Sequence, residues 1–240
     1  MSRRSDLDRL YRILEDLAQR IGGPYRLDDP RVRRLVPTRG VYFFFEPGEF
    51  REDGQTPRVV RVGTHAVSTG SRTTLWQRLA AHRGRIGGRH PGGGNHRGSI
   101  FRLHVGTALI NRGLAPAAAA LSWEQERPAD PALREAEHQL EQMVSQHIRS
   151  MPFLWVAVDD PPGPQSHRKV IEANAVALLS NLGKEPIDPP SPNWLGRWAS
   201  RPAIRESGLW NVDHVDEPYA PEFLDLLEQY VRNTPAHPVV

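Results

Sequence analysis

The stretch that decides the fold is RGVYFFF at residues 39–45, together with RVVRVG at 58–63 and LWQRLAAH at 75–82. The first two segments are short, apolar and rich in aromatic or β-branched residues, which is typical of buried strands. The stretch between them, residues 47–57, is polar, contains glycine and proline, and predicts a loop or hairpin connection. The third segment has leucines at helical spacing and predicts a helix over residues 73–83.

Outward from this stretch, the spacing of apolar residues predicts further elements on both sides. We expect a third strand at residues 153–158 and helices over 6–21, 99–110, 131–150, 168–182 and 222–231. For residues 99–110 an alternating strand is the alternative. The order of elements predicts an α+β fold, with helices around a small three-stranded sheet.

Composition excludes several kinds of chemistry. The 240 residues include no cysteine, so disulfides, thiolate zinc sites and cysteine nucleophiles are absent. The N-terminal 22 residues carry four acidic side chains and lack the apolar core of a signal peptide, and no run approaches ~18 apolar residues. We therefore expect a cytoplasmic protein without a membrane partner.

The charge is distributed unevenly along the chain. Net charge is only +3, yet residues 54–123 contain no aspartate or glutamate and hold ten arginines and five of the ten histidines. A basic stretch of this kind is typical of a protein that binds a polyanion. The alternative is a solvated basic face that reflects biased codon usage.

Four pieces of the sequence resemble the GIY-YIG nuclease superfamily, in the family's own order. Gly40-Val41-Tyr42 matches the Gly-Ile-Tyr tripeptide, and Arg61-Val62-Gly63 stands where the family has Tyr-Ile-Gly. Residues 75–82 match the family's L-x-x-R-L-x-x-H helix, and Glu172 lies on a helix after the third strand, where the family places its metal-binding glutamate. The resemblance is close over residues 39–82 and loose over 153–181.

The resemblance implies a division of the chain into three parts. We predict a helical extension over residues 1–38 and a GIY-YIG nuclease-like domain over 39–185. That domain would carry a helical and basic-loop insertion at about 84–150. Residues 186–240 would be a Pro/Trp-rich extension packed on the domain; its Trp194, Trp198 and Trp210 either pin it to the core or stack on bases, and we favour the first role.

The resemblance also implies a catalytic set. Tyr42 takes the role of general base, and Glu172 holds a divalent metal ion. A single carboxylate completed by waters and substrate phosphate suits Mg²⁺ or Mn²⁺. Arg78 and His82, four residues apart, share one helix face. From it Arg78 can bind a phosphate oxygen, and His82 can either hydrogen-bond the phosphate or shuttle a proton near neutral pH. The alternatives are a core tyrosine, two exposed polar side chains, and a surface ion pair between Glu172 and Arg168, four residues earlier.

This chain departs from the family's pattern at two points. Arg61 replaces the second signature tyrosine; an arginine cannot act as a general base but can bind phosphate. His65, four residues on, is a candidate to occupy the vacated space. The family's asparagine has three candidates here, Asn174, Asn181 and Asn193.

The glycine-rich basic loop at residues 84–98 predicts a flexible segment that orders on a phosphate backbone. The nucleic-acid-binding candidates are Arg72, Arg83, Arg85, Arg89 and Arg97. A disordered surface loop is the alternative, and an HNH-type metal site from His90, Asn95 and His96 is disfavoured because the segment has no strand pattern.

Taken together, these features predict a Mg²⁺-dependent endonuclease acting on DNA, with RNA not excluded. The alternatives are a catalytically degenerate nucleic-acid-binding module on the same fold, for which Arg61 is the main argument, and a structural subunit of a larger assembly.

Overall fold

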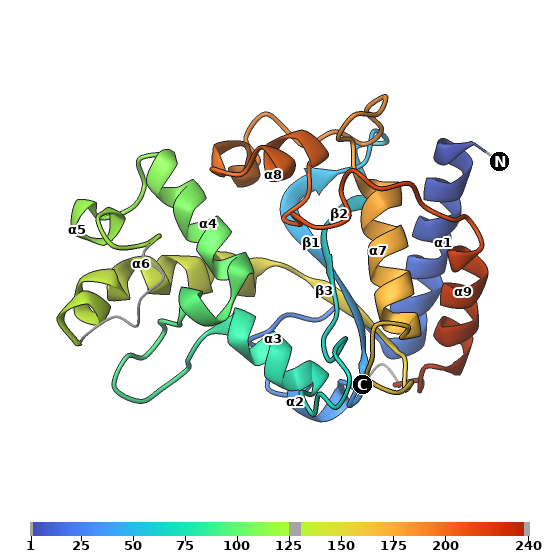
Figure 1. The fold of residues 1–240 in the computed structure, drawn as a ribbon, viewed down its shortest axis with the longest axis horizontal. Coiled ribbons are helices and arrows are strands. Elements are labelled where there is room, and N and C mark those ends of the chain that lie inside the picture. Colours follow the sequence, from blue (N-terminus) through green and yellow to red (C-terminus); the bar gives the residue numbers. More distant parts are fainter. Residues whose placement is uncertain (1, 125–130, 238–240) are drawn as a thin grey trace.

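A three-stranded antiparallel sheet with helices on both faces forms the centre of the molecule in the computed structural model, which describes residues 2–124 and 131–237 (Figure 1). The strands are β1 (Gly40–Phe50), β2 (Pro57–Gly63) and β3 (Phe153–Ala157), in the order β2-β1-β3. The predicted α+β class and all three predicted strands are confirmed.

Strand β1 is longer than the sequence predicts. It continues past Phe45 to Phe50, which pairs with Pro57. The prediction of a loop over residues 47–57 is therefore wrong for residues 47–50, which belong to β1, and for Pro57, which begins β2. The register shifts between Phe45 and Phe50, around Pro47, which has no amide to donate to a neighbouring strand. A short turn then joins β1 to β2, with the Asp53 carboxylate accepting from the amides of Gln55 and Thr56.

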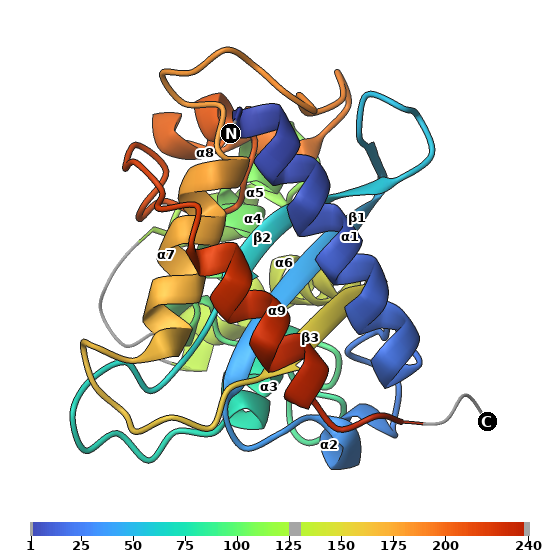
Figure 2. The same cartoon turned by 90° about the vertical axis from the view of Figure 1, so that its right-hand side faces the viewer.

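The two faces of the sheet are covered by different sets of helices. Figure 2 shows one face crossed by α1 (Arg3–Ile21), α7 (His167–Leu179) and α9 (Phe223–Asn233). The other face carries α3 (Leu75–Arg83), α4 (Ile100–Asn111) and α6 (Pro131–Ser150). Alternate residues of β1 point to opposite faces, so Tyr42 and Phe44 both face this second set, where they meet His82 and Phe101.

The helices follow the predicted pattern, with two kinds of exception. Residues 99–110 are helical, as favoured, but α7 ends at Leu179, three residues before the predicted end, because Ser180 is extended. Five elements of three to six residues were not predicted, since one turn is too short to show a period. They are α2 (Val32–Leu35), η1 (His96–Gly98), α5 (Ala117–Ala120), η2 (Leu195–Trp198) and α8 (Pro202–Ser207). Within the described ranges, no helix has the length and apolarity that crossing a membrane requires.

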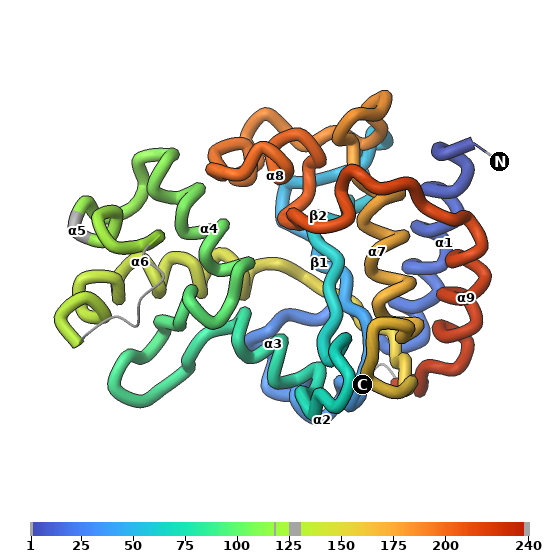
Figure 3. Tube along the Cα trace, viewed as in Figure 1, coloured from blue at the N-terminus to red at the C-terminus, as the bar shows by residue number. Residues whose placement is uncertain are grey.

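The segment after α7 crosses the outer edge of β2 before it reaches α9 (Figure 3). The Trp210 amide donates to the Val60 carbonyl, and the Asn211 side chain bonds both the amide and the carbonyl of Val62. The indoles of Trp194 and Trp210 both donate to Glu46, at 2.9 Å each. The expectation that tail tryptophans pin this segment to the core is thus confirmed for these two residues.

Candidate active site

Tyr42 lies in the middle of the sheet, opposite Gly63 on β2 and Trp155 on β3. Its side chain is fully buried. A Cβ atom on Gly63 would lie 2.2 Å from the Tyr42 hydroxyl and 2.3 Å from Cζ, much closer than atoms can approach. The glycine that ends the second signature segment is therefore required because the Tyr42 ring occupies the place of its side chain.

A chain of hydrogen bonds runs from Tyr42 to the first turn of α4. The Tyr42 hydroxyl lies 2.9 Å from His82 Nε2, and His82 Nδ1 lies 2.8 Å from the Ser99 hydroxyl. Burial lowers the pKa of His82 well below its usual value, and the nearby cations Arg61, Arg78 and Arg102 lower it further. The imidazole is therefore neutral, with one nitrogen that donates and one that accepts.

A hollow of about 350 Å³ opens between β2, α3, α4, α7 and the segment that crosses the β2 edge. We call it the Glu172 pocket. Its lining includes Arg61, Arg78, His104, Glu172, Arg201, Asn211, Asp213 and His214.

Glu172 reaches the pocket from α7, where its carboxylate is half-buried. Its Oε1 accepts from the amide of Thr64, the residue after Gly63, at 3.1 Å. Burial raises the pKa of Glu172, and Arg61, His214 and Arg78 oppose that rise. Gly63 packs against the Tyr42 hydroxyl, and the next residue, Thr64, binds Glu172. The Tyr42 hydroxyl and the Glu172 carboxylate therefore contact adjacent residues at the end of β2.

Three arginines line the same pocket without an ion pair to a carboxylate in the described part of the chain: Arg61, Arg78 and the exposed Arg201. Arg61 is buried, donates to the Trp210 carbonyl at 2.6 Å and lies 4.6 Å from the centre of the Phe101 ring. Arg78 is half-buried and makes no ion pair within residues 2–124 and 131–237. The lining thus holds three guanidinium groups against the carboxylates of Glu172 and Asp213, an excess of positive charge that suits an anion which also brings a cation.

Three of the residues proposed from sequence, Tyr42, His82 and His65, are not part of the lining of this pocket. His82 is fully buried behind Tyr42, so the direct phosphate contact expected for it does not fit its position. His65 is buried outside the pocket lining, where burial and the nearby Arg168 lower its pKa to about 4. The space next to Arg61 is filled by Phe101 and Trp210 instead.

The surface pair considered for Glu172 does not form. Arg168 is fully buried, and its guanidinium binds Asp160 and the carbonyls of Val158 and Ala66. The charge of Arg168 is thus matched by Asp160, and Glu172 faces the pocket without it.

The asparagine in the pocket is none of the three that sequence suggested. Asn174 bonds Val170 and Ala220 on the outer side of α7, and Asn181 is held by Arg3 and Ile187. Asn193 is exposed. Asn211 occupies the pocket, placed there by its two bonds to the edge of β2.

His214 is a further pocket residue that sequence reasoning missed. Its backbone has a φ of 64°, a conformation that non-glycine residues rarely adopt. Its Nδ1 lies 2.8 Å from Glu217 Oε1, which leaves Nε2 on the other side of the ring. No sequence signal marked His214, because it lies in an irregular segment whose path depends on the β2 edge.

The basic loop holds fewer available cations than its sequence suggests. Arg97 binds Glu137 through two nitrogens, at 2.7 and 2.8 Å, and Arg83 lies 4.9 Å from the Trp76 ring centre. Arg72, Arg85 and Arg89 are exposed. His96 is buried against Trp123 and bound to Glu141, which removes it from any HNH-type arrangement.

The donor set of the pocket fits a hydrated divalent cation. In the described ranges, no group of three His, Cys, Asp or Glu side chains is placed to hold a metal ion. Among the same residues, Glu172 Oε1 has the Thr64 amide as its partner and Oε2 has none. Mg²⁺ commonly takes one or two carboxylates and completes its shell with waters and phosphate oxygens, so this single carboxylate suits it.

Comparison with known proteins agrees with this arrangement. A family model described as a GIY-YIG domain matches residues 1–237. No curated protein and no solved structure matches the chain. The match runs through every strand and through the helices that carry Arg78, His82 and Glu172, and this chain therefore belongs to the GIY-YIG family, whose members are generally endonucleases.

Proposed function

We propose that this protein is a divalent-metal-dependent endonuclease that hydrolyses DNA phosphodiesters in the Glu172 pocket. One observation carries the proposal. At the end of β2, Gly63 packs against the Tyr42 hydroxyl and Thr64 binds Glu172. Arg61 and Arg78 line the pocket beside Glu172. Phosphodiester hydrolysis needs an activated water, charge neutralisation on the phosphate and stabilisation of the leaving oxygen. The lining of the pocket and Tyr42, which is buried beside Gly63, together offer a group for each of these.

Arg61 and Arg78 would bind the non-bridging oxygens of the scissile phosphate. Arg78 has no carboxylate partner in the described residues, and the Trp210 carbonyl holds Arg61 in place. A guanidinium presents paired N–H donors that match two phosphate oxygens, so each can bind in a bidentate manner.

Glu172 would hold Mg²⁺ or Mn²⁺, which supplies charge stabilisation to the phosphate and the leaving oxygen. The two arginines repel a free cation, whereas a bound phosphate attracts it. Cation and DNA are therefore expected to bind the pocket together.

Tyr42 and His82 would move the proton of the attacking water. The Tyr42 oxygen takes that proton while its own hydroxyl proton passes to the neutral His82 Nε2, 2.9 Å away. The water oxygen forms the new bond to phosphorus as the bond to the leaving oxygen breaks. A phenol is a weak base alone at neutral pH, and His82 Nε2 gives the proton a place to go. Because the lowered pKa of His82 makes it a weak base too, this transfer is expected to be concerted with attack on the phosphate.

His214 is the pocket residue best arranged to give the leaving oxygen a proton. Glu217 fixes one side of its ring, so Nε2 is the nitrogen that remains to act. An imidazole exchanges protons readily near neutral pH. The unusual backbone of His214 is the kind of local strain that is often retained at functional positions.

A second function remains open, a nucleic-acid-binding module without cleavage. It is favoured by the replacement of the second signature tyrosine by Arg61 and by the complete burial of Tyr42. Arg61, Arg78 and the basic loop would still bind a phosphate backbone in such a module.

The deciding experiment is cleavage of supercoiled plasmid with Mg²⁺, Mn²⁺ or EDTA, by the wild type and by Glu172→Gln. Glutamine keeps an oxygen for the Thr64 amide and removes the charge, so the fold is preserved. Metal-dependent nicking by the wild type that is lost in the variant supports the nuclease. Salt-sensitive binding without cleavage in either protein would support the binding module.

A further inference from the structure

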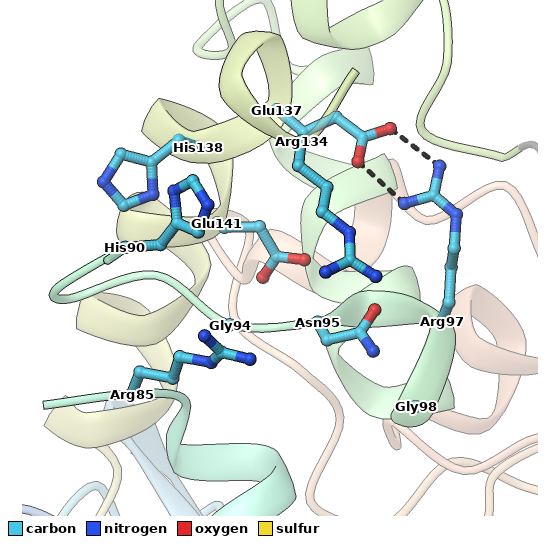
Figure 4. Close-up of a pocket in the computed structure, with 10 residues that line it drawn as sticks. All are labelled: Arg85, His90, Gly94, Asn95, Arg97, Gly98, Arg134, Glu137, His138 and Glu141. Atoms are coloured by element: carbon cyan, nitrogen blue, oxygen red, sulfur yellow. Dashed lines mark hydrogen bonds and ion pairs between the residues drawn. The ribbon is translucent and has the colours of Figure 1, made fainter. Parts of the chain in front are cut away.

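A second hollow, of about 340 Å³, lies between the basic loop and α6 (Figure 4). We call it the Arg134 pocket. Arg85, His90, Gly94 and Asn95 line it from the loop, and Arg134, Glu137, His138 and Glu141 line it from α6.

The loop that forms one wall is built into the fold. Arg85 and Gly93 are joined by a hydrogen bond from the Arg85 amide to the Gly93 carbonyl, and Gly92 donates back to Arg85. The carbonyl of Gly93 also accepts from Ser145 of α6. A Cβ atom on Gly94 would lie 2.2 Å from the Arg102 guanidinium, so this glycine lets the loop pack on a buried side chain. Gly94 therefore serves close packing, whereas a Cβ atom on Gly87 or Gly88 would meet no atom within 4 Å.

The acidic side chains of the pocket are already neutralised. Glu137 binds Arg97 and the Ser122 hydroxyl. Glu141 binds the buried Arg102 and His96. Neither carboxylate is left to balance a further cation.

Two arginines of the pocket are unmatched. Among the described residues, Arg85 and Arg134 make no ion pair with a carboxylate. Figure 4 shows their guanidinium groups pointing toward the middle of the pocket from opposite walls. His90 and His138 stand beside them, with ring centres 5.3 Å apart, and add further hydrogen-bonding groups. The pocket thus offers an excess of positive charge and planar donors, which suits a phosphate.

The Arg134 pocket connects with the Glu172 pocket through a third hollow. That hollow shares Arg97 and Gly98 with the Arg134 pocket, and it shares Arg78 and Ile100 with the Glu172 pocket. A ligand that spans all three must be long and carry negative charge at intervals, as a nucleic-acid backbone does.

We propose that the Arg134 pocket binds a backbone phosphate of the same nucleic acid whose scissile phosphate lies in the Glu172 pocket. This inference rests on the proposed function and adds a binding site, centred on Arg85 and Arg134, that positions the substrate away from the reacting atoms. Because phosphate contacts fix register without reading bases, the site contributes affinity and placement and no sequence preference.

The test measures DNA binding without cleavage. A fluorescent duplex of about 20 base pairs is titrated by anisotropy between ~50 and ~200 mM salt, with Glu172→Gln as the parent protein in every case. Arg85→Ala with Arg134→Ala removes both guanidinium groups, and Arg85→Lys with Arg134→Lys keeps the charge. The matched control is Arg12→Ala with Arg232→Ala, two exposed arginines on α1 and α9 at the other end of the molecule (Figure 1).

We expect the alanine pair to weaken binding at low salt by roughly tenfold for each arginine and to reduce the slope of log affinity against log salt by about 0.9 for each lost contact. The lysine pair keeps most of the slope and loses part of the affinity. The control pair changes neither. All of the substituted side chains are exposed, so the thermal midpoints should agree.

Three results would overturn the inference. If the alanine pair binds the duplex as tightly as the control pair, while the wild type cleaves plasmid, the second site is wrong and the nuclease stands. If inorganic phosphate raises the thermal midpoint of the parent but not of the alanine pair, and duplex affinity is unchanged, the pocket takes a free phosphate. Failure of the parent to bind the duplex at any salt would overturn the proposed function together with this site.

Discussion

Two clusters of charged side chains both adjoin α4, and they balance their charges in opposite ways. In the junction of α4 with α6, Arg102 faces Glu141 and Arg97 faces Glu137, with hydroxyls and carbonyls completing the bonds. In the Glu172 pocket, three arginines stand with two carboxylates, Glu172 and Asp213, and the Glu172 carboxylate binds only a backbone amide among the described residues. A completed network holds elements together, whereas an incomplete one is available to a ligand.

The comparison shows why charge counted along the sequence overstates the binding surface. The acid-free stretch at residues 54–123 looks uniformly basic, yet acids elsewhere in the chain match Arg58, Arg97 and Arg102. What remains unmatched is concentrated at the two pockets and the exposed loop arginines. The distribution of partners, more than the number of cations, separates structural from binding arginines.

The largest expected effect comes from Tyr42→Phe, compared with Tyr11→Phe. Both hydroxyls are buried, but that of Tyr42 contacts His82 and that of Tyr11 accepts from the Val59 amide. Loss of a positioned acid–base group lowers rates by about 10²–10⁴-fold, so Tyr42→Phe should reduce plasmid nicking by this factor. Tyr11→Phe should leave nicking unchanged and cost roughly 1–3 kcal/mol of unfolding free energy, because an amide loses its partner.

Equal nicking by wild type and Tyr42→Phe would remove Tyr42 from the reaction. Urea denaturation of both variants separates loss of chemistry from loss of fold, and Tyr42→Phe should unfold near the wild-type midpoint, since the ring still fills its site beside Gly63.

The second prediction breaks the completed network. Glu141→Ala leaves the fully buried Arg102 without its carboxylate and should reduce the unfolding free energy by about 3–5 kcal/mol. Replacing both residues together, Arg102→Met with Glu141→Leu, should recover much of that loss, because no charge is then left unpaired. Urea titrations of the wild type, the single variant and the double variant give both numbers. A double variant no more stable than the single one would show that Arg102 acts mainly through its bonds to carbonyls.

Sequence predicted the part of this architecture that depends on local pattern. The apolar runs predicted β2 and β3, and helical spacing predicted α6 with its C-terminal end at Ser150. It could not predict that β1 continues past Pro47, because pairing with Pro57 depends on a turn closed by Asp53.

The residues of the candidate site show the same contrast between local sequence pattern and long-range contacts. Tyr42, Arg78 and Glu172 could be proposed from sequence because a family motif marks them. Asn211 and His214 were missed, because their place is set by hydrogen bonds to β2, a strand 149 residues earlier at Val62. Long-range pairing of this kind leaves no period in the sequence.

The third prediction concerns pH. Burial lowers the pKa of His65 and of His104 to about 4. At a pH between about 4 and 6.5, both side chains therefore stay neutral in the folded protein, whereas in the unfolded chain they become protonated. For a histidine whose folded pKa is depressed, stability is full above the unfolded value near 6.5 and falls as pH drops toward 4. Each should contribute a slope of up to about 1.4 kcal/mol per pH unit in that window.

Urea midpoints at several pH values between 7 and 4.5 measure the slope of stability against pH. His65 and His104 are expected to contribute equally to this slope, so His104→Gln should remove about half of their combined contribution. Glu172 acts in the opposite direction: its raised pKa means that stability is lost as pH rises through the folded value. Glu172→Gln should therefore stabilise the protein at neutral pH. A pH-independent midpoint would show that the histidines are charged or open to water.

The smallest effect is expected from substitutions at two helix caps, those of α3 and α4. Thr74 accepts from Gln77 at the start of α3, and Ser99 accepts from Arg102 at the start of α4. Replacing either by alanine should cost about 1 kcal/mol of unfolding free energy. Ser99 also holds His82 Nδ1, at 2.8 Å, so Ser99→Ala alone should disturb the imidazole that accepts the Tyr42 proton.

The readout that separates the two caps is the pH profile of nicking beside the urea midpoint. Thr74→Ala should keep the wild-type profile, while Ser99→Ala should slow nicking several-fold and shift the profile, because the fixed partner of Nδ1 determines which nitrogen of a neutral histidine can accept. Ser99→Thr should restore both, since a hydroxyl is retained. If the two alanine variants behave alike in nicking as well as in stability, Ser99 is only a helix cap. Chemistry in the Glu172 pocket would then not depend on the Ser99 hydroxyl at the start of α4.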